Sequence, residues 1–153
     1  MMILLQVCLV IHLAGLALLA GTIVSELVVF RTFSIRFERD GVVSAGLVDL
    51  AARFPVVKAI GGGALILSGI GLFTVTQGTF GHQLWFQVKM LLILGLVING
   101  FITGSKLERR LKEGIRTNES SLLKSAAINL QRFCMTELGL ILVIIVLAVF
   151  KFN

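Results

Sequence analysis

Four ionisable side chains stand inside long apolar stretches of the 153-residue chain, and they are its first candidates for chemistry. They are His12, Glu26, Lys89 and Glu137. An ionisable group in the hydrocarbon of a membrane costs about 2.5 to 3.5 kcal/mol, so each of them needs a partner or a function. A rise of about 1.5 Å per residue along a helix then sets the depth of each side chain.

His12, Ser68 and Lys89 fall at similar depths, each counted from the outer end of its own apolar stretch. The helical rise places His12 roughly 13 to 15 Å deep. We expect these three residues to form one polar layer in the outer half of a bundle. His12 is then either an axial ligand of haem or a metal, or a buried imidazole bonded to a neighbouring helix. Lys89 either extends its ammonium to the membrane surface or holds an acidic group such as a haem propionate.

Glu137 and Asn99 fall at a common depth in the inner half, with Glu26 close to the inner membrane surface. We expect Asn99 to hydrogen-bond Glu137, and Arg132 or Arg31 to neutralise a carboxylate. This second layer is either an interhelical polar pair or part of a proton path, because intramembrane carboxylates are common in proton relays.

The remaining candidates for chemistry are scattered. His82 stands in a polar turn, and Cys8, Cys134, Met90 and Met135 are far apart in the sequence. Copper sites use clustered His, Met and Cys ligands, so copper is only an alternative here. The two cysteines fall near opposite membrane faces and are not expected to form a disulfide. The sequence has no zinc, P-loop, dinucleotide-binding or Ser/His/Asp motif.

Composition makes a membrane the solvent for most of this chain. Hydrophobic residues make up 57% of it and the mean hydropathy is +1.01, which excludes an ordinary soluble domain. The net charge is +6. The basic residues cluster beside apolar runs rather than among aromatic residues on a polar surface. They therefore indicate membrane topology and contact with the lipid bilayer, and we expect no nucleic-acid partner.

The apolar runs predict an all-α fold, a polytopic membrane four-helix bundle that forms a single domain over residues 1–153. Its helices are expected at about 3–30, 56–76, 84–103 and 133–150. About 20 apolar residues are enough for a helix to cross a bilayer. The first run is longer than the apolar core of a secretion signal, so we expect it to remain as a spanning helix.

Most of the 14 Lys and Arg residues fall in two segments, 31–53 and 106–132. By the positive-inside rule, these two basic segments are cytoplasmic and both termini lie outside. Residues 42–54 are expected to form a short amphipathic helix at the inner surface. Pro55 is expected in the first turn of the second spanning helix, where its missing N–H is not needed. The second basic segment is expected to return along the cytoplasmic face in partly helical form.

The second spanning helix is rich in glycine, with Gly61, Gly62, Gly63, Gly69 and Gly71. Small residues let helix backbones approach closely in lipid. This helix is therefore expected to pack tightly on a neighbour, either within the chain, in a homodimer or in a membrane partner.

Several short motifs follow one another in a distinctive order. They are Arg53-Phe54, Ser68-Gly69 in the glycine-rich helix, and Phe80-Gly81 followed by Leu84 and Lys89. This order resembles the CopD-type copper-resistance membrane domain. The stretch LWFQVKMLLILGLVINGF, His12 followed by Gly21, and the final Val-Phe-Lys-Phe are similar to the related HemJ-type protoporphyrinogen oxidases.

The resemblance implies a four-helix membrane protein with a haem or porphyrin site. In it, His12 matches the first-helix histidine and Lys89 the third-helix lysine. Where the HemJ-type pattern carries a further histidine after that lysine, this chain has Asn99. A five-coordinate haem on His12, a haem shared across a dimer, and no haem at all therefore remain open.

The function predicted from the sequence is that of a bacterial inner-membrane protein that binds haem b or a porphyrin and supports a membrane redox step. His12 is the expected ligand and Lys89 the expected propionate partner, with Ser68 in the same layer. One alternative is a copper-handling membrane protein, which requires His12, His82 and Met90 to converge. The other is a non-catalytic membrane subunit or assembly factor that docks on a partner through its glycine-rich second helix.

Overall fold

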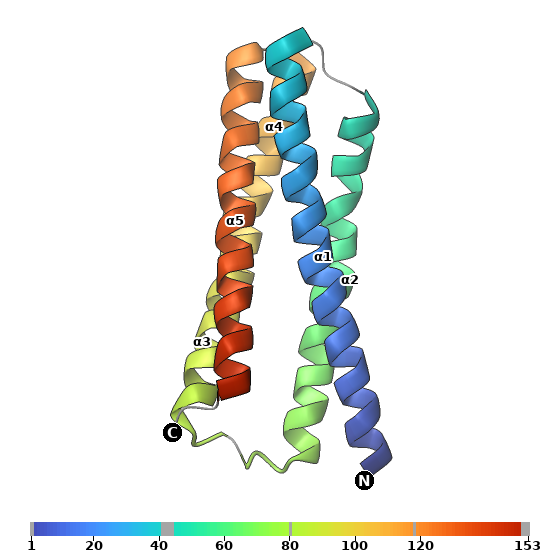
Figure 1. The fold of residues 1–153 in the computed structure, drawn as a ribbon, viewed down its shortest axis with the longest axis vertical. Helices are drawn as coiled ribbons and strands as arrows, with labels where there is room; N and C mark the ends of the chain where they lie inside the picture. The colour runs from blue at the N-terminus through green and yellow to red at the C-terminus, as the bar shows by residue number, and fades with distance from the viewer. Residues whose placement is uncertain (1, 41–44, 80, 118, 151–153) are drawn as a thin grey trace.

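The computed structural model describes residues 2–40, 45–79, 81–117 and 119–150, and over these ranges the chain is mostly helical, with turns between α2 and α3 and no strand. In chain order the elements are α1 (Met2–Asp40), α2 (Ala45–Val75), α3 (Leu84–Asn99), the π-helix η1 (Gly100–Gly104), α4 (Ser105–Thr117) and α5 (Ser120–Phe150). Because α3, η1 and α4 follow one another without a break, the elements form four long rods (Figure 1).

All four rods are long and apolar enough to cross a membrane. The segments that meet this criterion are Met2–Arg39, Asp49–Val75, Leu84–Thr117 and Ser120–Phe150. Large apolar side chains are exposed along them, among them Leu4, Leu67, Leu91 and Leu142. Such a surface is stable against lipid rather than water. The chain is therefore a multi-pass membrane protein, and the four predicted spans are confirmed.

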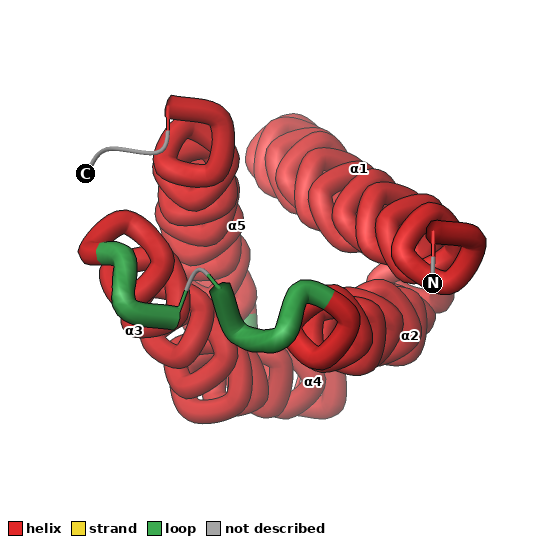
Figure 2. The backbone as a smooth tube through the Cα atoms, turned by 90° about the horizontal axis from the view of Figure 1, so that it is seen from below, coloured by secondary structure: helices red, strands yellow, loops and turns green. Residues whose placement is uncertain are grey.

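The rods pack as two pairs joined through α1 and α5. α1 packs on α2 and on α5, and α5 packs in turn on α3 and α4. Seen along the bundle, α1 lies beside α2 and α5 lies beside α3 (Figure 2). The start of α1 and the end of α5 lie at the same end of the bundle (Figure 1).

The buried core is concentrated in the half of the bundle that contains α4. It joins the second half of α1, α4 and the first half of α5. Leu107 and Leu111 stand one turn apart on α4 and are both buried, while the neighbouring Arg109 and Arg110 are exposed. On α5 the buried face includes Leu123. Each fully buried Leu contributes about 1.5 to 3 kcal/mol, so this half of the bundle is held by hydrophobic packing.

The predicted ends of three helices are wrong, because the charged segments continue the rods. α1 extends to Asp40, and α5 begins at Ser120 rather than near 133. α4 occupies part of the segment that was expected to return along the cytoplasmic face. Lys, Arg and Glu are good helix formers. Buried apolar residues also give these extensions a stripe of their own, with Phe33 on α1, Leu107 and Leu111 on α4, and Leu123, Ala127 and Leu130 on α5.

Pro55 lies inside α2 and not in its first turn, so this prediction is also wrong. α2 begins at Ala45. The amphipathic helix predicted for 42–54 is not separate, since residues 45–54 belong to α2 and residues 42–44 lie outside the described residues. A proline removes one backbone hydrogen bond. The helix-forming run Leu50-Ala51-Ala52 precedes Pro55. It favours continuation of the helix although this one hydrogen bond is missing.

Two glycines allow the backbones of α1 and α2 to approach each other closely. A Cβ atom placed on Gly61 would lie 3.1 Å from the backbone nitrogen of Leu19 and 3.2 Å from the carbonyl oxygen of Gly15. A Cβ atom on Gly15 would in turn lie 3.1 Å from the carbonyl oxygen of Gly61. Each glycine therefore leaves the space that the other helix fills.

Other glycines of α2 receive α1 side chains. A Cβ atom on Gly69 would lie 3.7 Å from Cε1 of His12, and one on Gly71 would lie 2.8 Å from Sγ of Cys8. A Cβ atom on Gly62 would meet nothing within 4 Å. Much of the glycine content of α2 is thus accounted for by packing within the chain.

Gly61→Ala is expected to destabilise the bundle, and Gly62→Ala serves as its matched control. The added methyl group at position 61 must push α1 and α2 apart, and overpacking of this kind costs about 1 to 3 kcal/mol. At position 62 the methyl group meets open space, so a gain in helix propensity of up to about 1 kcal/mol remains. Thermal unfolding in mild detergent measures the change in stability of both variants. Shifts of the same sign and size would contradict the close contact.

Candidate functional site

A buried ion pair joins α1 to α2 in the half of the bundle that contains the core. Nζ of Lys58 lies 2.9 Å from Oε1 and 2.9 Å from Oε2 of Glu26. The Glu26 side chain is almost fully buried and that of Lys58 is mostly buried. Nζ of Lys58 also lies 5.9 Å from the centre of the Phe133 ring of α5. The ammonium therefore contacts groups from two other helices.

Cys134 of α5 is fully buried beside this pair. Its Sγ lies 3.5 Å from Oε2 of Glu26, within the range of a weak S–H donor to a carboxylate. Cys134 and Glu137 are three residues apart on α5, so they share one face of that helix. Cys8 and Cys134 are both free thiols.

Glu137 completes the inner cluster, which we define as Glu26, Lys58, Cys134 and Glu137. Its side chain is only 3% exposed, and it lies within electrostatic range of Lys58 and Glu26. No hydrogen-bond partner of Oε2 is found among the described residues. A buried polar atom without a partner costs about 1 to 3 kcal/mol, and more when it is charged. The cluster thus contains one group that the fold does not satisfy.

The π-helix η1 begins at the residue that faces Glu137. A Cβ atom on Gly100 would lie 3.4 Å from Oε1 of Glu137. The side chain of Asn99 is engaged within its own helix, because Oγ1 of Thr103 donates to Oδ1 of Asn99 at 2.9 Å. The hydrogen bond predicted between Asn99 and Glu137 is not found among the described residues. Asn99 therefore leaves the carboxylate unsatisfied.

The outer layer is centred on a hydrogen bond between α1 and α2. Nδ1 of His12 lies 3.0 Å from Oγ of Ser68. The Ser68 hydroxyl donates to the carbonyl oxygen of Ala64 at 2.5 Å. Its oxygen must then accept from His12, so the imidazole carries its proton on Nδ1. The imidazole also forms a hydrogen bond with the backbone of Leu65 on α2.

The structure brings most of the predicted site residues into two groups. His12 and Ser68 are in contact, and Lys89 lies within electrostatic range of His12. Glu26 and Glu137 both belong to the inner cluster. Arg31 and Arg132 are exposed, and Lys58 is the cation that neutralises Glu26.

Lys58, Cys134 and Glu108 were missed as site residues by the sequence analysis. Glu108 of α4 is half-buried and lies within electrostatic range of Lys58 and Glu26. A signal for Lys58 was present, since it falls inside the predicted second span and near the same membrane surface as Glu26. No comparable signal marks Glu108, because only the extension of α4 brings it to the cluster.

No site for a metal ion assembled from three ligands is found in the described part of the chain. His, Cys, Asp and Glu side chains do not form such a group there. His82 is exposed in the turn before α3, and Met90 is exposed on α3. The convergence of these two residues with His12, which the copper alternative requires, has no support in this arrangement.

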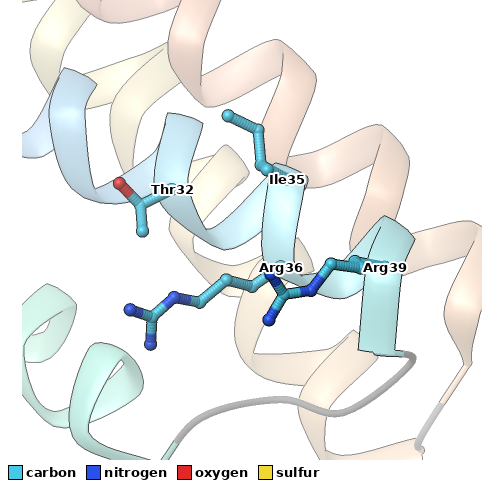
Figure 3. Close-up of a pocket in the computed structure, with 4 residues that line it drawn as sticks. All are labelled: Thr32, Ile35, Arg36 and Arg39. Atoms are coloured by element: carbon cyan, nitrogen blue, oxygen red, sulfur yellow. The ribbon is translucent and has the colours of Figure 1, made fainter.

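A basic hollow lies on the surface of α1, away from the inner cluster. Thr32, Ile35, Arg36 and Arg39 line it, and its volume is about 450 Å³ (Figure 3). Both arginine side chains project to the same side of the helix (Figure 3). The four described residues that line it all belong to α1.

No family, curated protein or solved structure matches the chain. The resemblance to CopD-type and HemJ-type proteins therefore stays a prediction from the short motifs.

Lys58→Met is expected to cost about 3 to 5 kcal/mol of unfolding free energy, because it leaves Glu26 buried without a counter-charge. Lys124→Met is the matched control. Nζ of Lys124 lies 2.7 Å from Oε1 of Glu38, but these side chains are 54% and 57% exposed. Loss of such a surface pair costs less than about 1 kcal/mol.

The stability of the Lys58 and Lys124 variants is measured by unfolding with heat or with graded detergent. Combining Lys58→Met with Glu26→Gln is expected to restore part of the loss, since the uncompensated charge is then removed. Equal effects of the two lysine substitutions would contradict a structural role for the buried pair.

Proposed function

We propose that this chain is a bacterial inner-membrane protein that binds haem b or a porphyrin through His12 and supports a membrane redox step. The observation that carries the proposal is the state of the imidazole. Ser68 and the backbone of Leu65 hold the ring in one orientation. In the tautomer in which Nδ1 donates to Ser68, Nε2 keeps a lone pair for a ligand. Histidines that ligate metals are held in the same way, with the other ring N–H donated to a neighbouring acceptor.

Three residues of the outer layer have distinct roles in this proposal. Ser68 orients the ring, and His12 offers Nε2 to the iron. Lys89 supplies a cation for a propionate, in line with its electrostatic range to His12. Bound haem would supply one-electron chemistry, with its potential set by the axial ligand and the polarity around it.

An absorption spectrum of the purified protein, oxidised and then reduced with dithionite, tests the proposal. Wild-type protein expressed with added haem is expected to show a Soret band, and His12→Ala is expected to lose it. Ser68→Ala is expected to weaken haem binding by about 10- to 100-fold, the usual cost of removing the group that orients a ligand. His82→Ala replaces the exposed histidine and is expected to keep the full band.

A featureless wild-type spectrum would overturn the haem proposal, as would a band that survives in His12→Ala. The preferred hypothesis would then be a non-catalytic membrane subunit. Gly62 and Gly63 are adjacent α2 glycines whose Cβ positions are open, so they are the place to probe for a partner helix or a second copy of the chain.

We further propose that both termini face outside and that the basic end of the bundle is cytoplasmic. This rests on the Lys and Arg residues of α4 and of the second half of α1, which lie together at one end of the rods (Figure 1). Cytoplasmic loops carry an excess of such residues.

Thiol labelling with a membrane-impermeant reagent on intact spheroplasts tests this orientation. In a background with Cys8 and Cys134 replaced by Ser, Thr79→Cys in the turn between α2 and α3 is expected to react. Ser121→Cys, in the first turn of α5, is expected to react only after the membrane is opened. The reverse pattern would contradict the proposed topology.

A further inference from the structure

The inner cluster contains one more carboxylate than it has cations to neutralise. Glu26 from α1 and Glu137 from α5 face a single ammonium, Lys58 from α2. Lys58 is bound to both oxygens of Glu26. Glu137 receives no such bond, and its Oε2 is buried without a partner among the described residues. The charge of Glu137 is thus the one that the fold leaves uncompensated.

We propose that the inner cluster is a proton-exchange site and that Glu137 carries the exchangeable proton. Protonation removes the buried charge and turns one carboxyl oxygen into an O–H donor, which lowers the cost of keeping this side chain in the bundle. The Glu26–Lys58 ion pair lies beside it and sets the local field. The occupant is a proton, because Oε2 of Glu137 is the buried side-chain atom left without a hydrogen-bond partner among the described residues.

The groups that face Glu137 come from several helices. Glu26 approaches from α1, Lys58 from α2, and Cys134 lies on α5 itself. η1 presents the backbone of Gly100. Glu108 of α4 stands further out, in electrostatic range of Glu26, Lys58 and Lys112.

Glu108 provides a route between the inner cluster and water. It is half-buried on α4, whose neighbouring Arg109 and Arg110 are exposed. A carboxylate in this position can pass protons between the solvent and the Glu26–Lys58 pair. Proton relays in membranes are built from such rows of acidic side chains.

The π-helical turn gives the site a second distinctive feature. η1 interrupts the α-helical hydrogen bonding of the third rod at Gly100, the residue that packs on Glu137. Single π-helical turns within α-helices occur often at functional sites. Glycine at this position lets the carboxyl group approach the backbone, where a Cβ atom would be in contact with Oε1.

Infrared spectroscopy of the full-length protein in lipid nanodiscs tests the proposal. The wild type is expected to show a protonated-carboxyl C=O band at neutral pH that shifts in D₂O and is lost as the pH is raised. Glu137→Gln is expected to abolish this band. Glu119→Gln, which changes an exposed carboxylate before α5, is expected to leave it intact.

Glu137→Asp keeps a carboxyl group and guards against misfolding of the Gln variant. It is expected to move the band rather than remove it. A band that keeps its wild-type position in both variants, a band insensitive to pH, or the absence of any protonated-carboxyl band would overturn the proposal. Suppression of the wild-type band by Na⁺ or K⁺ at constant pH would overturn it in favour of a cation site.

The proton-exchange site and the haem proposal stand independently. Glu137→Gln leaves His12 and Ser68 unchanged, so the Soret band is expected to be the same with and without the exchangeable carboxyl group. Failure of either proposal can therefore be recognised separately.

Discussion

The ion pair between Lys58 and Glu26 is the constraint on which the half of this bundle that contains α4 depends. Both groups are removed from water, and desolvation of two charges is offset only when their geometry is good. Contact of Nζ with both carboxylate oxygens meets that condition. The pair fixes the register of α1 against α2, and the Phe133 ring over Lys58 brings α5 to the same point. The orientation of Glu137 towards these charges follows from that register.

The two halves of the bundle are held by different forces. Between α1 and α2, Gly15 and Gly61 let the helices approach closely, and dispersion between backbones takes the place of large interlocking side chains. In the half that contains α4, Leu107, Leu111 and Leu123 form an apolar seam between α4 and α5. The hydrophobic effect stabilises that seam, because the opposite faces of its helices carry charged residues that can be hydrated.

The two polar groups of the bundle differ in how fully the fold satisfies them. His12 and Ser68 form a chain of hydrogen bonds that ends on the carbonyl oxygen of Ala64, and His12 also bonds to the backbone of Leu65. In the tautomer proposed above, Nε2 is the ring atom left for a ligand. In the inner cluster the unsatisfied atom is an oxygen of Glu137. A nitrogen lone pair favours a metal ion or an acid, and a buried carboxylate favours a proton, which is why the two sites support different proposals.

The sequence by itself determined the membrane, the four spans and the common depth of His12 and Ser68. These follow from hydrophobicity and from the fixed rise of a helix, which need no knowledge of neighbours. Tertiary structure decided that Lys58 neutralises Glu26, that Asn99 turns to Thr103, and that Oε2 of Glu137 has no partner among the described residues. Depth along a helix leaves its rotation and its neighbours undefined, and pairing depends on both. The helix ends were missed for a related reason: the leucine seam that extends α4 and α5 is stable only when the two helices pack together.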